Sequence, residues 1–253
     1  MGWATDVRWW RRLSAVAKAV AINVVVFAAL RVAVAVSDAG VLRLVEMPSR
    51  LEVLASRPWT VLTYMVAQYD VIHLLVNMVW LWCFGRFLCD VMAPRRFAAL
   101  YVAGGLGGAV VFAAVCGVLP SLAGVNHWLI GSSASVVAVV AATAIMMPYL
   151  EVNLFMIGPL QMRWVAWITI ALDLTGLFGA HPGSHFAHLG GLAAGVIFAL
   201  WMRRAPRRAP RPATVTDDRR RLDELLDKVR QSGFASLSIQ ERRELMQLSE
   251  RLK

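Results

Sequence analysis

The chain has 253 residues, of which 58% are hydrophobic, with a mean hydropathy of +0.59 and a formal net charge of +10. A soluble domain could not bury so much apolar surface, so the composition excludes an ordinary globular fold and indicates a polytopic membrane protein. The basic residues cluster between nearly uncharged apolar segments, as orientation signals do, so we expect a lipid bilayer and no nucleic acid as partner.

The chain opens with a basic, Trp-rich segment over residues 1–12, which suits a cytosolic lead-in at the membrane interface. A first apolar segment follows over residues 13–36. A cleaved signal peptide is the competing interpretation, but the apolar run is long for one. Residues 37–69 mix charged residues with short apolar patches, and we expect them to form a loop on the membrane surface.

Five more apolar stretches predict five more membrane-spanning helices. At a rise of about 1.5 Å per residue, roughly 17 to 22 helical residues cover a hydrocarbon core of about 30 Å. The stretches are residues 71–91, 97–118, 131–147, 162–178 and 185–202. The predicted fold class is therefore all-α, with a six-helix transmembrane domain over residues 13–202.

The arginines alternate between connections and so predict the orientation of the helices. Basic residues lie before the first span (Arg8, Arg11, Arg12) and between the second and third (Arg86, Arg95, Arg96). They also lie between the fourth and fifth spans (Arg163) and after the sixth (the arginines of residues 203–211). The positive-inside rule then places both termini in the cytoplasm. Arginine-rich inner loops without a targeting presequence suit a bacterial inner membrane.

The C-terminal part has a different composition. Residues 203–216 form a basic, Pro-rich linker, and residues 217–253 carry leucines at helical spacing on either side of Gly233. Ser238 and Glu241 have the spacing of a capping box that opens a second helix. We expect a cytosolic helical hairpin here, a candidate binding element for an unknown cytosolic partner.

The three cysteines lie in or beside apolar segments. Cys83, Cys89 and Cys116 show no paired metal spacing and no even-numbered disulfide framework. We expect free thiols, no metal and no cofactor.

Polar side chains gather at the outer ends of three predicted helices. His73 and Asn77 belong to the second span, Ser133 to the fourth and His188 to the sixth. Each residue alone has an ordinary explanation, a helix cap for the serine and an interhelical hydrogen bond for the others. Together they place a hydroxyl, two imidazoles and a carboxamide at one depth, where ionisable groups tend to mark functional sites.

Small residues would allow the serine and histidine helices to approach each other. Gly191 and Gly195 follow His188 on its own helix face, and the serine helix has a small face of its own. That contact would bring Ser133 within hydrogen-bond reach of the imidazole, as an activated serine requires.

These motifs resemble those of the rhomboid intramembrane serine proteases. Three shared motifs follow one another on alternate helices: His73-x-x-x-Asn77-Met, Gly131-x-Ser133 and Ala187-His188-x-x-Gly191-x-x-x-Gly195. A fourth, Pro58-Trp59-x-x-x-Thr63, lies ahead of the second span. The resemblance covers roughly residues 15 to 202. It implies a six-helix rhomboid-like bundle that cleaves single-span membrane proteins near the outer membrane face, at segments with small, helix-destabilising residues.

The resemblance also implies the role of each site residue. Ser133 would be the nucleophile and His188 the general base, forming a dyad without a carboxylate, and His73 and Asn77 would stabilise the oxyanion. Ser132 and Ser135 are alternative hydroxyls, but only Ser133 fits the Gly-x-Ser register.

Three positions depart from the family pattern. Ala134 stands where a glycine usually follows the serine, and Val137 where an aromatic often packs on the histidine. Either change is expected to slow the enzyme or alter its substrate choice. Gln68 lies in the segment before His73 that often carries a histidine, and its presence is expected to weaken the outer polar network.

Two other functions remain open at this point. The first is a proteolytically inactive relative that binds membrane clients. The second is a proton-coupled transporter that uses His73, His188 and Asp173, because Asp173 is an acid inside the fifth span. No inverted repeat or broken helix pair supports a transporter, and the default explanation for Asp173 is a hydrogen bond from a neighbouring helix near the outer end of its span.

Overall fold

The computed structural model describes residues 10, 13–119, 122, 124–154, 158–179, 182–204 and 215–252. The chain divides into two compact units, Met1–Arg204 and Ala205–Lys253. Most of the predicted N-terminal segment 1–12 and of the linker 203–216 lies outside the described residues.

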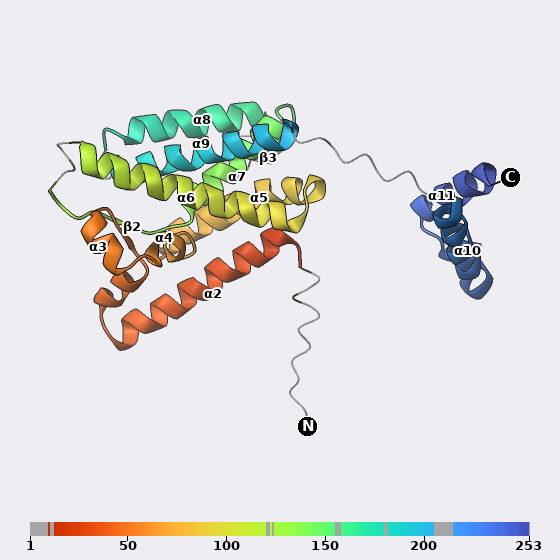
Figure 1. Cartoon of the computed structure of the whole chain (residues 1–253), viewed down its shortest axis with the longest axis horizontal. Coiled ribbons are helices and arrows are strands. Elements are labelled where there is room, and N and C mark those ends of the chain that lie inside the picture. The colour runs from red at the N-terminus through yellow and green to blue at the C-terminus, as the bar shows by residue number, and fades with distance from the viewer. Residues whose placement is uncertain are drawn as a thin grey trace, which may run out of the picture. The chain divides into compact units, whose positions relative to one another are not determined.

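The first unit is a bundle of six apolar helices that coincide with the six predicted ones (Figure 1). The helices are α2 (Ala15–Val36), α5 (Val71–Val91), α6 (Pro94–Val118), α7 (Ser133–Met146), α8 (Met162–Gly176) and α9 (Pro182–Arg204). Among the described residues, four of them, α2, α5, α6 and α9, are long and apolar enough to cross a membrane by themselves. The chain is thus an all-α polytopic membrane protein.

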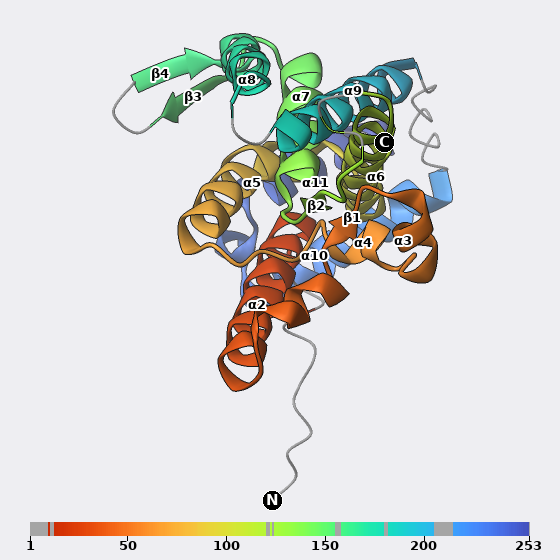
Figure 2. The same cartoon turned by 90° about the vertical axis from the view of Figure 1, so that its left-hand side faces the viewer.

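Helix α7 forms the centre of this bundle, between α5, α6 and α9 (Figure 2). It consists of small and β-branched apolar residues on every side, and its residues from 134 to 144 are all buried. A helix that is apolar all round is stable only when it is surrounded. With 14 residues it extends about 21 Å, which is less than the thickness of a hydrocarbon core of about 30 Å.

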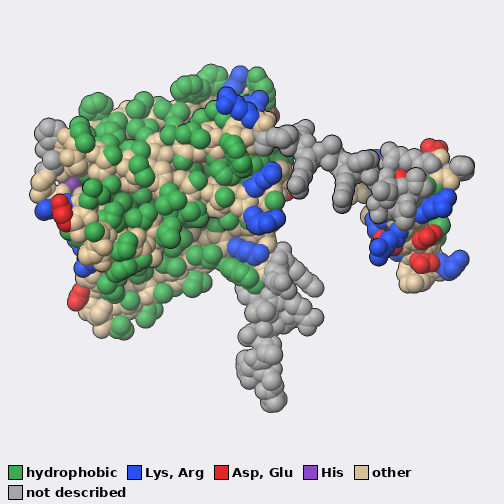
Figure 3. All heavy atoms as spheres, in the orientation of Figure 1, with side chains coloured by type: hydrophobic (Ala, Val, Ile, Leu, Met, Phe, Trp, Pro, Cys, Tyr) green, Lys and Arg blue, Asp and Glu red, His purple; other side chains and the backbone are tan. Residues whose placement is uncertain are grey.

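The outer surface of the bundle is largely hydrophobic (Figure 3). Lys and Arg side chains gather at one end of it, whereas the few at the opposite end lie beside acidic side chains. Arg95 and Arg96 at the start of α6 are exposed, and so are Arg163 at the start of α8 and Arg203 and Arg204 at the end of α9. These positions all lie at the same end of an up-and-down bundle, as the charge pattern predicts.

The first connection, residues 37–69, is folded onto the bundle. It contains η1 (Ala39–Leu44), β1 (Met47–Pro48), α3 (Leu51–Ser56) and α4 (Thr60–Thr63). The Trp59 indole N–H donates to the carbonyl of Leu44 (2.9 Å), and the Thr63 hydroxyl donates to that of Val45 (3.1 Å). These two bonds explain why the Pro-Trp-x-x-x-Thr motif holds this loop in a compact form.

Two short sheets were not predicted. Strand β1 pairs antiparallel with β2 (Trp128–Leu129), just before the Gly131-x-Ser133 motif. Strands β3 (Glu151–Leu154) and β4 (Gly158–Gln161) form a hairpin between α7 and α8. The strands have only two or four residues each, which is too short for a pattern that identifies a strand in the sequence.

The second unit contains α10 (Val215–Ser232), η2 (Phe234–Ser236) and α11 (Ile239–Arg251). The predicted capping box is present at Ser238 and Glu241. Leu225, Leu237 and Leu248 form its buried core. Across the hairpin, the Arg221 guanidinium donates two hydrogen bonds to Glu244 (3.0 and 3.1 Å), and the Lys228 ammonium lies 2.7 Å from Glu241.

Candidate active site

Ser133 lies at the first position of α7, where the chain enters the helix from a sharp turn. Gly131 has a φ of +129°, which favours glycine, and its N–H donates to the carbonyl of Tyr64 (3.0 Å). A Cβ at residue 131 would lie 2.8 Å from the His73 ring. The Gly-x-Ser spacing therefore supplies both the turn and the room for a histidine beside it.

The hydroxyl of Ser133 contacts the imidazole of His188. Ser133 Oγ and His188 Nε2 are 2.7 Å apart, and both residues are half-buried. Ser132 and Ser135 are fully buried; the Ser132 hydroxyl accepts a hydrogen bond from Gln68 (3.1 Å), and the Ser135 hydroxyl has no hydrogen-bond partner among the described residues. Of the three hydroxyls, only that of Ser133 meets a histidine and is partly exposed.

Close packing of α9 on α7 makes this contact possible. A Cβ at Gly191 would lie 2.2 Å from the carbonyl oxygen of Ala134, and one at Gly195 would lie 2.3 Å from that of Ala138. Both positions exclude any side chain. The predicted role of the two glycines is confirmed.

Asp173, near the end of α8, faces the other side of the His188 ring. Its Oδ1 lies 2.7 Å from His188 Nδ1 and 3.0 Å from His185 Nδ1, and the residue is 6% exposed. The default explanation, hydrogen bonds from a neighbouring helix, is thus confirmed for Asp173. The carboxylate-free dyad implied by the resemblance is wrong as a description of this geometry, because α8 runs antiparallel to α9 and ends beside it.

His185 was not singled out in the sequence, although it precedes His188 by three residues and therefore shares its helix face. The two rings meet edge to face, with centroids 5.6 Å apart. A Cβ at Gly176 would lie 2.2 Å from the His185 ring, so this glycine provides the space that the ring fills.

Asn77 and His73 approach the serine from α5. The Asn77 side chain is buried, and its amide nitrogen donates one hydrogen bond to Gln68 Oε1 (2.9 Å), which leaves its second N–H available. The His73 ring lies against the backbone of Gly131, two residues before Ser133. All four predicted site residues therefore gather at one end of the bundle.

Gln68 strengthens the polar network rather than weakening it, so the expectation for this position is wrong. Its side chain is fully buried, and its amide nitrogen donates to Ser132 Oγ and to Asn23 Oδ1 (3.1 Å each) while its oxygen accepts from Asn77. A glutamine can donate and accept at once, and it therefore joins α2, α5 and the start of α7.

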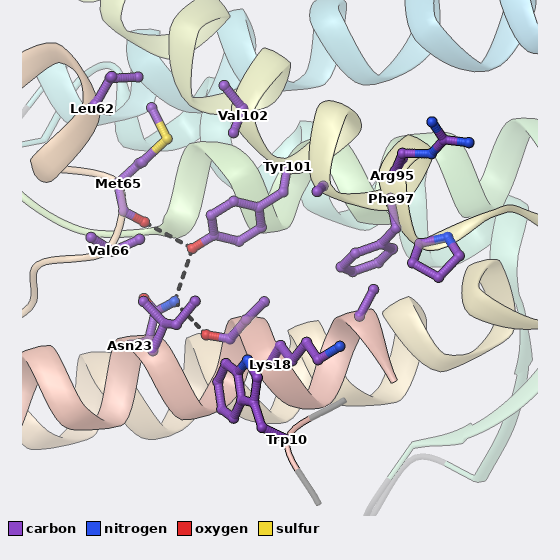
Figure 4. Close-up of a pocket in the computed structure, with 15 residues that line it drawn as sticks. Trp10, Lys18, Asn23, Leu62, Met65, Val66, Arg95, Phe97, Tyr101 and Val102 are labelled. Carbon is purple, nitrogen blue, oxygen red and sulfur yellow. Dashed lines mark hydrogen bonds between the residues drawn. The ribbon is translucent and has the colours of Figure 1, made fainter. Parts of the chain in front are cut away.

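The same network reaches an apolar cavity of about 660 Å³ between α2 and α6 (Figure 4). Asn23, on its wall, donates to the Tyr101 hydroxyl (3.0 Å), which donates to the carbonyl of Met65 (2.8 Å). None of the four predicted site residues lines this cavity.

The two departures next to the serine are accommodated by other helices. The methyl group of Ala134 fills the space left by Gly108 of α6, where a Cβ would lie only 2.6 Å away. Val137 is buried and places no aromatic ring on His188, whose aromatic neighbour is instead His185 of its own helix.

One group of side chains in the described part of the chain has the composition of a metal site. Ligand atoms of Asp173, His185 and His188 lie within 4.8 Å of one another. Both histidine Nδ1 atoms are hydrogen-bonded to Asp173, so a cation would have to replace these two bonds.

Comparison with known proteins gives a consistent result. Residues 55–205 match the rhomboid domain family. The chain is 30% identical over 149 residues to the presenilin-associated rhomboid-like protein A, mitochondrial, of Danio rerio, and 29% identical over 136 residues to the rhomboid protein 1, mitochondrial, of Saccharomyces cerevisiae. These matches cover 55% and 53% of this chain but only 38% of each relative.

Proposed function

This chain belongs to the rhomboid family, and from that premise we propose that it is an intramembrane serine endopeptidase with Ser133 as nucleophile and His188 as general base. The observation that carries the proposal is the 2.7 Å contact between Ser133 Oγ and His188 Nε2. A nucleophile and a base within hydrogen-bond reach, with the base held by a third group, are the signature of an activated serine.

The proposed reaction needs only groups that this site contains and water. Ser133 transfers its proton to His188 Nε2 while Oγ attacks the carbonyl carbon of a peptide bond. The protonated imidazole then gives that proton to the leaving amine, and an acyl-enzyme remains. Water, deprotonated by His188 in the same way, releases the acid and regenerates the serine.

Three donors are placed to stabilise the negative oxygen of the tetrahedral intermediate. The N–H of Ser133 belongs to the first turn of α7 and has no partner within the helix. Asn77 has a free amide N–H, and the ring of His73 lies beside Gly131. Donors that are held in place in a site of low dielectric stabilise such an anion far more than water does.

The proposed substrates are the transmembrane segments of single-span membrane proteins. The site lies at the start of a 14-residue helix that is too short to fill a hydrocarbon core, which favours cleavage below the outer membrane surface. Segments with small, helix-destabilising residues would present an accessible peptide bond, because a regular helix shields its own.

We place both termini on the cytoplasmic side of a bacterial inner membrane. The exposed arginines at the start of α6, at the start of α8 and at the end of α9 support this orientation. The relatives from Danio rerio and Saccharomyces cerevisiae are both named as mitochondrial proteins.

The contact between Ser133 and His188 also favours this proposal over an inactive client-binding protein. A binding protein needs no bonded serine–histidine pair at the end of its helices, whereas hydrolysis does. The transporter alternative gains nothing from Asp173, because its Oδ1 is engaged by two histidines of the same site.

The proposal is tested by cleavage of a reporter with one transmembrane segment, reconstituted with the purified protein in liposomes. The wild type should release a fragment whose new terminus maps near the outer boundary of the segment. Ser133→Ala and His188→Ala should release none, and Ser135→Ala, which removes a buried hydroxyl away from the imidazole, should cleave like the wild type. Equal cleavage by Ser133→Ala would overturn the proposal.

A further inference from the structure

We propose that Asp173 is a positioning residue of this site: its carboxylate orients His188 and holds it in the tautomer that can accept the proton of Ser133. This inference rests on the proposed protease function. It adds a third member, from α8, to a pair that otherwise comes from α7 and α9.

The geometry is a continuous chain of hydrogen bonds through three helices. Ser133 Oγ lies 2.7 Å from His188 Nε2, and His188 Nδ1 lies 2.7 Å from Asp173 Oδ1. The imidazole is held at both nitrogens, so rotation of its ring would break two bonds.

The burial of Asp173 shows that its carboxylate depends on its hydrogen-bond partners. At 6% exposure in an apolar bundle, a carboxylate is costly unless hydrogen bonds compensate it. Both hydrogen bonds found for the Asp173 side chain come from α9, from His188 and His185. The carboxylate therefore affects the two histidines and has no direct contact with Ser133.

The chemistry of the carboxylate sets the position of the proton on His188. An ionised carboxylate only accepts hydrogen bonds, so Nδ1 of His188 must carry the proton. In the neutral ring Nε2 then has a free lone pair, which is the atom that faces Ser133. When His188 takes up the serine proton, the negative charge of Asp173 stabilises the imidazolium without itself being protonated.

His185 restrains the carboxylate in turn. It donates from Nδ1 to the same Oδ1, at 3.0 Å, and its ring meets that of His188 edge to face. Its side chain is 30% exposed, against 19% for His188, so His185 is the more accessible of the two histidines. The loss of His185 would loosen Asp173 while leaving the bond to His188 possible.

The decisive variant is Asp173→Asn, which preserves the shape of the side chain. An amide can donate to Nδ1 of His188 and so favour the tautomer with its proton on Nε2, which cannot accept from Ser133. We expect kcat for the reporter to fall by about 10² to 10⁴ with KM little changed. His185→Ala should lose less, and Asp90→Asn, the same change at an exposed carboxylate near the end of α5, should behave like the wild type.

A second measurement depends neither on activity nor on the Asp173→Asn variant. Nitrogen-15 spectra of the wild type with labelled histidine, assigned with His188→Gln and His185→Gln, should show the His188 proton on Nδ1. If Asp173→Asn folds, its spectrum should show that proton on Nε2.

The outcomes separate this inference from the proposed function. Wild-type kcat in a folded Asp173→Asn protein, or a neutral His188 with its proton on Nε2 in the wild type, would overturn the role of Asp173. An inactive wild type whose His188 carries the proton on Nδ1 would instead contradict the protease function and leave the positioning of the ring intact.

Discussion

At the scale of single residues, the site consists of polar side chains that are held in place by hydrogen bonds to one another. Asn77 illustrates this. Its side chain is buried, and one of its amide N–H groups donates to Gln68. This bond fixes the orientation of the amide and therefore of its second N–H. A donor held in this way costs no reorganisation when negative charge develops on a substrate oxygen.

The role of this donor can be measured directly. Asn77→Ala should lower kcat for reporter cleavage by about 10² to 10³, and His73→Ala should do the same, because each removes one oxyanion donor. Steady-state kinetics in liposomes would separate kcat from KM. The matched control is Asn153→Ala, which removes an exposed amide from strand β3; a wild-type kcat in folded Asn77→Ala would exclude the amide as an oxyanion donor.

Residue identities predicted which side chains of α5, α7 and α9 gather at the candidate site, but they did not predict that Asp173 contacts His188. The motif spacing placed Ser133 and His188 in register, because both belong to helices whose contact is marked by glycines. The contact of Asp173 with His188 depends on where α8 ends relative to α9, and nothing in the local pattern of either segment contains that information. The i, i+3 spacing of His185 and His188 was the available signal for the second histidine.

At the scale of helices, the position of α9 on α7 determines whether the serine and histidine meet. At Gly191 and Gly195 the two backbones are so close that no methyl group would fit between them. Gly107 and Gly190 do the same between α6 and α9. The geometry of the candidate site therefore depends on glycines that have no chemical role in the proposal.

Gly191→Ala tests this dependence. The added methyl would lie 2.2 Å from the backbone oxygen of Ala134, so α9 must move away from α7 and the contact between Ser133 and His188 must lengthen. Overpacking of this kind costs about 1 to 3 kcal/mol, and we expect a lower melting temperature and a loss of cleavage. Gly117→Ala on α6, where nothing lies within 4 Å of the new Cβ, is the control and should change neither.

Helix positions followed closely from hydropathy, whereas the connections did not. Apolar runs bounded by Pro, Gly and Arg gave the ends of α5 and α6 within three residues. The β3–β4 hairpin escaped prediction because a strand of four residues carries too little periodicity to be recognised. The sequence predicted a loop over residues 37–69 but not its four elements, because these depend on bonds to distant backbone, such as that from Trp59 to Leu44.

At the scale of the whole molecule, the chain combines a membrane bundle that holds every candidate site residue with a separate helical hairpin. The hairpin has its own leucine core and its own ion pairs, and none of its described residues belongs to the site. The division at Arg204 follows from a change of composition that the sequence shows plainly.

Deletion of residues 213–253 should therefore leave reporter cleavage in liposomes largely unchanged. The expected result is a kcat and a KM like those of the full chain, since all hydrogen bonds of the site lie within the first unit. Complete loss of cleavage in a truncated protein that keeps its melting temperature would show that the hairpin is part of the enzyme.

The central claim is that Ser133 is a nucleophile activated by His188, and covalent labelling tests it most directly. The purified protein in detergent is treated with a fluorophosphonate probe, digested and analysed by mass spectrometry for the modified peptide. We predict that the wild type is modified at Ser133, that His188→Ala and Ser133→Ala are not, and that Ser135→Ala is labelled like the wild type. Labelling of Ser133→Ala at the wild-type rate, or of another residue in the wild type, would contradict the account.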